Sequence, residues 1–235
     1  MKKSKRYLEQ RKKIEDKLYP IKDSINLIKD IASAKFDESV EMHLVTSADP
    51  KNAEEQIRTV ADLPHGTGKE TKVLVFAEGD AAATAKEFGA DYISDDEIVK
   101  KIEDGWLDFD VAIATPDQMS KIGKLGKYLG RKGLMPNPKT GTVVQPQNIA
   151  KSIEASRKGR TEIKLDSASV IHFNVGKSSF SDDQLFENLK SVVKTIYDSK
   201  PEGLKGKLVK KASISTTMGP GIQLDIEDLE SSIYN

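Results

Sequence analysis

The sequence contains no cysteine, a single tryptophan and no long apolar run, and these absences exclude whole classes of protein. Without cysteine the chain can form neither a disulfide framework nor a thiolate metal site, which suits a reducing compartment. No apolar run approaches the roughly 20 residues that span a bilayer. The cationic N-terminus, MKKSKRYLEQRKK, lacks the apolar stretch of a secretory signal. We therefore expect a soluble, cytoplasmic protein with no membrane partner.

Net charge is also absent, since 37 lysines and arginines balance 37 acidic residues, but the charges are segregated along the chain. Between Gln118 and Arg160 the cations face a single acid, Glu154. The first 22 residues are also basic, whereas residues 70–117 and the last 14 residues are acidic. A cluster of one sign can recruit a polyanion whatever the total charge. This pattern favours a nucleic-acid partner over a chance sorting of solvated side chains.

The length of 235 residues allows two ordinary domains or one large one. In the middle, apolar runs alternate with helical patterns, and KVLVFA (72–77) is typical of a strand covered on both faces. Ser94 and Glu97 have the spacing of a capping box. This order predicts a parallel, doubly wound, Rossmann-like sheet. The expected elements are strands at 72–77, 90–93, 109–115 and TGTVV (140–144), and helices at 80–88, 94–102, after Thr115, and at about 146–158.

The flanks follow a different pattern. FDESVEMHLV (36–45) has strand alternation, and further strands are expected after Gly159 and near the C-terminus. A long amphipathic helix opens with Ser181 and Gln184 and closes before Pro201. Neither flank can close a core alone, so we expect them to combine. The predicted fold class is α/β with two domains: a discontinuous α+β sheet domain (1–66 and 160–235) interrupted by the Rossmann-like domain (67–159). Two chain crossings are the anatomy of a hinge.

Motifs for catalysis are incomplete. VGKSS (175–179) resembles the end of a phosphate-binding loop, but Ile171 stands where that loop needs glycine. The first strand of the middle is not followed by the G-x-G-x-x-G turn of dinucleotide-binding domains. The three histidines, His43, His65 and His172, lie far apart without ligand clusters. We therefore predict no enzyme, cofactor or metal, and keep a nucleotide-dependent enzyme with a doubly wound domain as the alternative.

Two loops suit binding. GRKGLMPNPKTGTV (130–143) combines glycines, prolines and cations, as expected of a rigid basic surface. STTMGPG (215–221) offers hydroxyls and backbone amides to phosphate or ribose, and a methionine to bases. The alternatives are a loop packed against its own domain for the first segment and an ordinary turn between strands for the second.

GRKGLMPNPKTGTV is similar to the signature of the L-one family of large-subunit ribosomal proteins in its bacterial form. Six further segments resemble that family in the same order: KRYLE, AKFDESVEMH (34–43), LPHGTGK (63–69), IHFNVGKSSF (171–180), KPEGLKG (200–206) and TTMGP (216–220). The chain departs from the family at Thr59, where glycine is usual, and at Ser39, where threonine is common. Serine keeps the hydroxyl and loses the methyl group.

The resemblance implies a structural protein of the mobile stalk beside the transfer-RNA exit site of the large subunit. It implies that the split domain binds large-subunit ribosomal RNA, that the protein assists release of deacylated tRNA, and that it represses its own mRNA through the leader. The free protein is expected to be a monomer. A dedicated mRNA repressor differs only in the RNA that it serves, and stays open. The RNA-contact positions implied are Lys35, Phe36, Ser39, Thr216, Thr217, Met218 and Gly219, with His172, Lys177 and Ser178 in a matching segment. The basic loop implied to face tRNA or ribosomal RNA comprises Lys124, Lys127, Arg131, Lys132 and Lys139.

Overall fold

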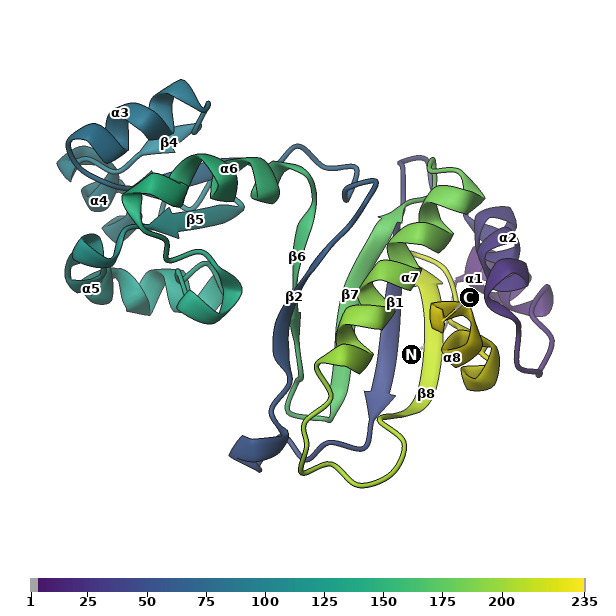
Figure 1. Ribbon diagram of the computed structural model, residues 1–235. Coiled ribbons are helices and arrows are strands. Elements are labelled where there is room, and N and C mark those ends of the chain that lie inside the picture. Colours follow the sequence, from purple (N-terminus) through teal and green to yellow (C-terminus); the bar gives the residue numbers. More distant parts are fainter. Residues whose placement is uncertain (1–3, 235) are drawn as a thin grey trace. The chain divides into compact units, whose positions relative to one another are not determined.

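The computed structural model describes residues 4–234 (Figure 1). The first three residues of the cationic N-terminal segment, and Asn235, lie outside the described residues. Contacts within the chain define two compact units. Met1–Gly68 together with Thr161–Asn235 is called the split domain below, and Lys69–Arg160 the inserted domain. The mixed α/β class predicted from the sequence is confirmed.

The split domain contains a four-stranded antiparallel sheet in the order β7-β1-β8-β9. Along the central strand β1, Val40, Met42 and Leu44 are buried, as the alternation of the sequence predicts. The strand begins three residues later than predicted, at Ser39, because the backbone bends at Lys35 and Phe36. The bounds are β1 Ser39–Thr46, β7 Val170–Lys177, β8 Val209–Thr216 and β9 Ile222–Leu224.

Helices cover one face of this sheet (Figure 1). The longest, α7 (Asp182–Asp198), begins with the predicted capping box: the Ser181 side chain accepts from the Gln184 N–H, and the Gln184 side chain accepts from the Ser181 N–H. Its apolar stripe shares one hydrophobic core with the inner face of the sheet. The other helices are α1 Lys5–Lys12, α2 Ile21–Ile31 and α8 Ile226–Tyr234.

A second, two-stranded sheet of β2 (Arg58–Asp62) and β6 (Arg160–Lys164) leads to the chain crossings. Asn188 of α7 is fully buried and fixes the chain just beyond β2. Its Oδ1 accepts from the N–H of His65 at 2.9 Å, and its Nδ2 donates to the carbonyls of Gly66 at 3.0 Å and Val175 at 2.8 Å. One amide thereby satisfies three backbone groups.

The inserted domain contains a parallel three-stranded sheet in the order β4-β3-β5. All four residues of β3 (Val73–Phe76) are buried, and they alternate between two hydrophobic clusters. Helices therefore cover both faces of the sheet, as the continuous apolar run predicts. The remaining elements are α3 Asp80–Glu87, β4 Tyr92–Ile93, α4 Asp96–Glu103, β5 Val111–Ala114, α5 Met119–Leu129 and α6 Ile149–Arg157, with short 3-10 turns between them.

Two local predictions for this domain are wrong. Asp95, not Ser94, caps α4, and its carboxylate accepts from the N–H of Ile98 at 2.7 Å. A carboxylate is also favoured there by the helix dipole. The segment TGTVV does not form a full strand and contributes only a parallel bridge between Val143 and Ala114. The 3-10 turns on either side of it interrupt the extended backbone.

Candidate RNA-binding surface

Three segments that are far apart in the sequence meet at one end of the four-stranded sheet. Because β1 is antiparallel to both β7 and β8, its first residues lie beside the last residues of those strands. Ser39 is paired with Lys177, and Val40 with Thr216. The segments 33–39, 177–179 and 216–219 therefore converge, and we call them together the three-loop end. All the predicted RNA-contact positions except His172 belong to these segments.

Two large apolar side chains are exposed at the three-loop end. Phe36 is 54% exposed and Met218 is 47% exposed. Burial of both side chains by a partner would remove apolar surface from water, which is favourable. An aromatic ring can stack on a nucleobase, and a polarisable thioether makes favourable contacts with aromatic rings.

Ser39 joins all three segments. Its hydroxyl accepts from the Lys177 Nζ at 2.9 Å, and its N–H donates to the Thr217 hydroxyl at 3.0 Å. The N–H of Thr217 donates in return to the Ser39 carbonyl at 3.0 Å. The side-chain contact at this position is therefore made by the hydroxyl, which serine and threonine share.

Thr216 and Gly219 are two of the predicted RNA-contact positions, and both shape the turn after β8. Thr216 is only 3% exposed, so its side chain supports the turn from inside. The Gly219 N–H donates to the Thr216 carbonyl at 3.2 Å. A Cβ atom on Gly219 would collide with the Thr216 hydroxyl. Only glycine fits this turn without a displacement.

Asp37 and Glu38 hold the three-loop end together, although neither was among the residues predicted from the sequence. Asp37 accepts from the hydroxyls of Ser178 at 2.9 Å and Ser179 at 2.7 Å, and from the Ser179 N–H at 3.1 Å. Glu38 is 1% exposed and accepts from backbone N–H groups on both sides. The only signal in the sequence was an acidic pair directly before a strand inside a segment expected to bind a polyanion.

The carboxyl groups of both residues stay ionised. Burial opposes ionisation of Glu38, but hydrogen bonds from the N–H groups of Met218, Ala34 and Ser33 lower its pKa below the usual value. Desolvation likewise opposes ionisation of Asp37, and the bonds from Ser179 and Ser178 lower its pKa. Each carboxylate therefore acts as a hydrogen-bond acceptor at neutral pH.

His172 lies away from the three-loop end, on the face of the sheet that the helices leave open. Its Nδ1 is 2.8 Å from the Nδ1 of His43 on the neighbouring strand. The Nε2 of His43 is 3.1 Å from the Ser215 hydroxyl, and the Nε2 of His172 is 3.5 Å from the Asp166 carboxylate. Burial, followed by the proximity of His172, lowers the pKa of His43. This row of polar side chains crosses three elements of the split domain.

Lys177 does not belong to a phosphate-binding loop. It ends β7, whereas α7 begins five residues later, so its ammonium group is not at a helix N-terminus. Its Nζ donates to Ser39 instead. Among residues 4–234 there is no group of three or more histidine, cysteine, aspartate or glutamate side chains that could hold a metal ion. Within the same range, no helix has the length and apolar character to cross a membrane.

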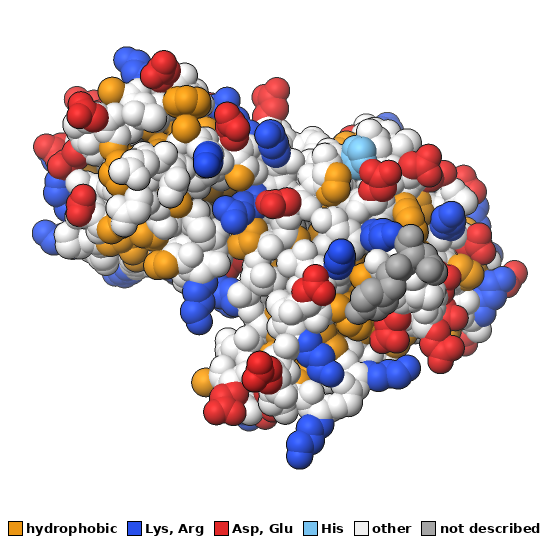
Figure 2. Space-filling view, in the orientation of Figure 1, with side chains coloured by type: hydrophobic (Ala, Val, Ile, Leu, Met, Phe, Trp, Pro, Cys, Tyr) orange, Lys and Arg blue, Asp and Glu red, His pale blue; other side chains and the backbone are white. Residues whose placement is uncertain are grey.

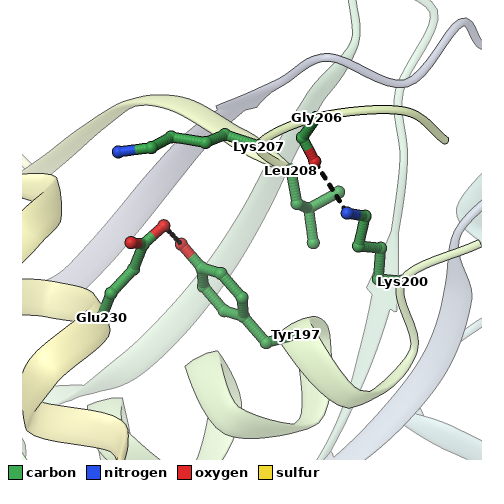
Figure 3. Close-up of a pocket in the computed structure, with 6 residues that line it drawn as sticks. All are labelled: Tyr197, Lys200, Gly206, Lys207, Leu208 and Glu230. Carbon is green, nitrogen blue, oxygen red and sulfur yellow. Dashed lines mark hydrogen bonds between the residues drawn. The ribbon is translucent and has the colours of Figure 1, made fainter.

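A pocket of about 260 Å³ lies at the opposite end of the sheet, where α7 ends and β8 begins (Figure 3). Three of its side chains already bond within the lining: the Tyr197 hydroxyl donates to Glu230 at 3.1 Å, and the Lys200 Nζ donates to the Gly206 carbonyl at 2.7 Å. These internal bonds leave little for a ligand to satisfy.

The inserted domain displays the predicted basic loop. The five cations are all exposed, and they lie on α5, on the 3-10 turn Gly130–Lys132 and on the turn Pro138–Thr140. They are Lys124, Lys127, Arg131, Lys132 and Lys139. By contrast, cationic and acidic side chains are interspersed over the split domain on the face drawn in Figure 2.

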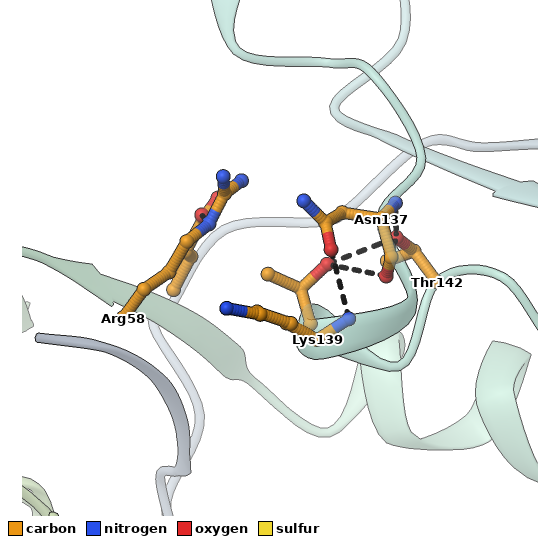
Figure 4. A network of polar contacts seen from close by, with 6 residues as sticks. Arg58, Asn137, Lys139 and Thr142 are labelled. Carbon is orange, nitrogen blue, oxygen red and sulfur yellow. Dashed lines mark hydrogen bonds and ion pairs between the residues drawn. The ribbon is translucent and has the colours of Figure 1, made fainter. Parts of the chain in front are cut away.

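Hydrogen bonds around Asn137 stiffen this loop (Figure 4). The Asn137 Oδ1 accepts from the Lys139 N–H at 2.8 Å, and the Asn137 N–H donates to the Thr142 hydroxyl at 2.8 Å. The Thr140 hydroxyl donates to the Asn137 carbonyl at 3.0 Å. Leu134 and Met135 are half-buried against the core of the inserted domain. The loop is therefore both packed on its own domain and rigid in its exposed, basic part.

Comparison with known proteins identifies the family. Residues 28–220 match the sequence profile described as the Ribosomal protein L1p/L10e family. The chain is 57% identical over 208 residues to the large ribosomal subunit protein uL1 of Dehalococcoides mccartyi, with 88% of each chain covered. It is 51% identical over 228 residues to the protein of the same name from Fervidobacterium nodosum, with 96% of each chain covered. The chain belongs to the ribosomal protein L1p/L10e family.

Proposed function

We propose that this chain, as a constituent of the large ribosomal subunit, binds a folded segment of large-subunit ribosomal RNA through the three-loop end of the split domain. The observation that carries the proposal is the convergence of segments 33–39, 177–179 and 216–219. Their hydrogen bonds fix hydroxyls, backbone amides and two exposed apolar side chains on one surface. RNA is recognised by shape, by its 2′-hydroxyls and by stacking on unpaired bases, and these are the groups that such recognition needs.

The basic helix α1 supports the same assignment. Gln10 is 5% exposed, and its Nε2 donates to the Ile31 carbonyl at 2.6 Å and to the Ser33 hydroxyl at 2.7 Å. These bonds attach α1 to the segment that enters the three-loop end. The exposed cations of α1 include Lys5, Arg11 and Lys12, and such charges attract phosphates from solution.

Two further functions are part of the proposal. The rigid basic loop of the inserted domain is the candidate contact for exit-site tRNA, since its cations are displayed on a backbone that loses little entropy on binding. The three-loop end would also bind a similar fold in the leader of the protein's own mRNA, and thereby repress its translation. In the free state the protein is expected to be a monomer.

The direct test is binding of the full-length protein to a folded fragment of large-subunit ribosomal RNA, measured by filter binding across a salt series. A specific complex should persist at moderate salt, and unrelated structured RNA should displace the ribosomal RNA fragment only poorly. Equal affinity for every structured RNA would contradict the proposal, since charge alone would then account for binding. Micromolar affinity for magnesium–ATP or NAD in calorimetry would instead favour the nucleotide-dependent alternative.

A further inference from the structure

Two adjacent carboxylates lie inside a surface that we assign to a polyanion. Asp37 and Glu38 should repel phosphates, so their presence at the three-loop end requires another reason. Both use their oxygens to hold other parts of this surface. The inference below rests on the proposed function, because it explains how the RNA-binding surface is given its shape.

Glu38 binds the backbone on two sides at once. Its Oε1 accepts from the N–H groups of Ser33 at 3.2 Å and Ala34 at 2.9 Å. Its Oε2 accepts from the N–H of Met218 at 2.9 Å, 180 residues further along the chain. The carboxylate is 1% exposed, so water does not compete for these bonds.

We propose that Glu38 is the positioning residue of the RNA-binding surface: its buried carboxylate clamps the turn that presents Lys35 and Phe36 to the turn that presents Met218. The two exposed apolar side chains are then held in one arrangement before RNA arrives. Binding to a preorganised surface loses less conformational entropy than binding to two independent loops. The carboxylate contributes to affinity without contacting RNA.

The three partners of Glu38 are backbone N–H groups, which can only donate. Glutamine at this position would keep one carbonyl acceptor and turn an NH₂ donor toward another donor. One side of the clamp would therefore open, although the volume of the side chain is unchanged.

Asp37 provides the matched control. Its Oδ1 accepts from the Ser178 hydroxyl and the Ser179 N–H, and its Oδ2 accepts from the Ser179 hydroxyl. A hydroxyl can reverse its role and accept. Asparagine can therefore keep all three bonds, with Nδ2 donating to Ser179. Glu38→Gln and Asp37→Asn remove the same charge from neighbouring positions, and only the first breaks a clamp.

The test compares these two variants with wild type in filter binding to the ribosomal RNA fragment. Glu38→Gln should weaken specific binding by about ten- to a hundred-fold, as expected for loss of a buried charged hydrogen bond. Its slope of log affinity against log salt should equal that of wild type, because no phosphate contact is lost. Asp37→Asn should lose much less affinity than Glu38→Gln, because asparagine can keep the three bonds of Asp37.

Amide hydrogen exchange of the free wild-type protein tests the clamp without any variant. The N–H groups of Ala34 and Met218 should exchange slowly although they lie in loops, because each donates to a buried carboxylate. In Glu38→Gln at least one of the two should exchange faster while the core amides of β1 and β8 stay protected. Fast exchange of both amides in wild type would overturn the inference, even if Glu38→Gln fails to fold.

The outcomes separate the clamp from the proposed function. If Glu38→Gln folds and binds like wild type while Met218→Ala binds weakly, the clamp is wrong and the site stands. If both variants bind like wild type, the assignment of the three-loop end to RNA is wrong. An equal loss in Asp37→Asn and Glu38→Gln would overturn the clamp, since charge rather than orientation would then be decisive.

Discussion

The hydroxyl of Thr216 occupies the space that a Cβ atom on Gly219 would need. Gly219→Ala should therefore displace either Thr216 or the turn that carries Met218, at a cost of about 1–3 kcal/mol. We expect a lower affinity for the ribosomal RNA fragment, measured by filter binding. Gly221→Ala is the matched control, because a Cβ atom there meets nothing within 4 Å. Equal affinities of the two variants would show that the shape of this turn is unimportant.

Met218→Ala and Thr217→Val should each weaken specific binding by about 1–3 kcal/mol, through loss of a packed contact or of a hydrogen bond. The salt slope should barely change, because neither side chain neutralises a phosphate. Leu18→Ala is the control for loss of an exposed apolar side chain. Leu18 is 57% exposed and precedes the N-terminus of α2, whereas the C-terminus of α2 leads to the three-loop end. Wild-type affinity of both site variants would refute the assigned surface.

Replacing Lys124 and Lys127 together by alanine should leave affinity for the ribosomal RNA fragment unchanged, because both lie on α5 of the inserted domain. The same double variant should weaken the binding of deacylated tRNA to reconstituted large subunits. Its salt slope should fall by about 1 for each lysine that contacts phosphate. Unchanged tRNA affinity, with normal incorporation into the subunit, would remove these two lysines from the tRNA contact.

The split domain should become less stable in mild acid, because protonation of His43 is disfavoured in the folded state. Its folded pKa lies below the ordinary value of 6.5, so the unfolded chain binds more protons in that interval. The stabilisation by neutral His43 is complete above about pH 7, and it is lost as pH falls through 6.5 to the folded pKa. The groups that face the pair are Glu41, which opposes the shift, and Asp166 beside His172.

The measurement is urea unfolding of wild type and His43→Gln between pH 5 and pH 8. The difference in unfolding free energy between the two proteins should shrink as the pH falls. A difference that is independent of pH would show that His43 keeps its ordinary pKa in the folded state.

Asn188→Ala should lower the unfolding free energy by about 1–3 kcal/mol for each backbone group left unsatisfied. Three such groups depend on this amide: the N–H of His65 and the carbonyls of Gly66 and Val175. Asn26→Ala, at an exposed position of α2, should change the stability by less than about 0.5 kcal/mol. Similar urea midpoints for the two variants would contradict the anchoring role.

Much of the fold could be predicted from local sequence patterns. The capping box of Ser181 and Gln184 and the apolar stripe of α7 depend on residues within a few turns of each other, so the pattern alone specifies them. The buried run of β3 likewise requires helices on both faces of its sheet. Asp95 in place of Ser94 lies at the end of a helix, where several residues can serve as the cap almost equally well. The expected strand TGTVV is reduced to a bridge at Val143, because 3-10 turns begin and end close to it.

The sequence by itself indicated the segment STTMGPG, because its hydroxyls, glycines and methionine suit contacts with RNA. The segments that contain Lys35 to Ser39 and Lys177 to Ser178 were implied by the resemblance to the L-one family. Only the tertiary structure decided how those segments are joined. Glu38 reaches Met218 across 180 residues, and Thr216 is turned inward while Met218 faces solvent. Such bonds depend on the antiparallel register of β1 with β7 and β8, which arises from the packing of the whole core. A local pattern shows that a residue can accept hydrogen bonds, but not which distant donors the fold will bring to it.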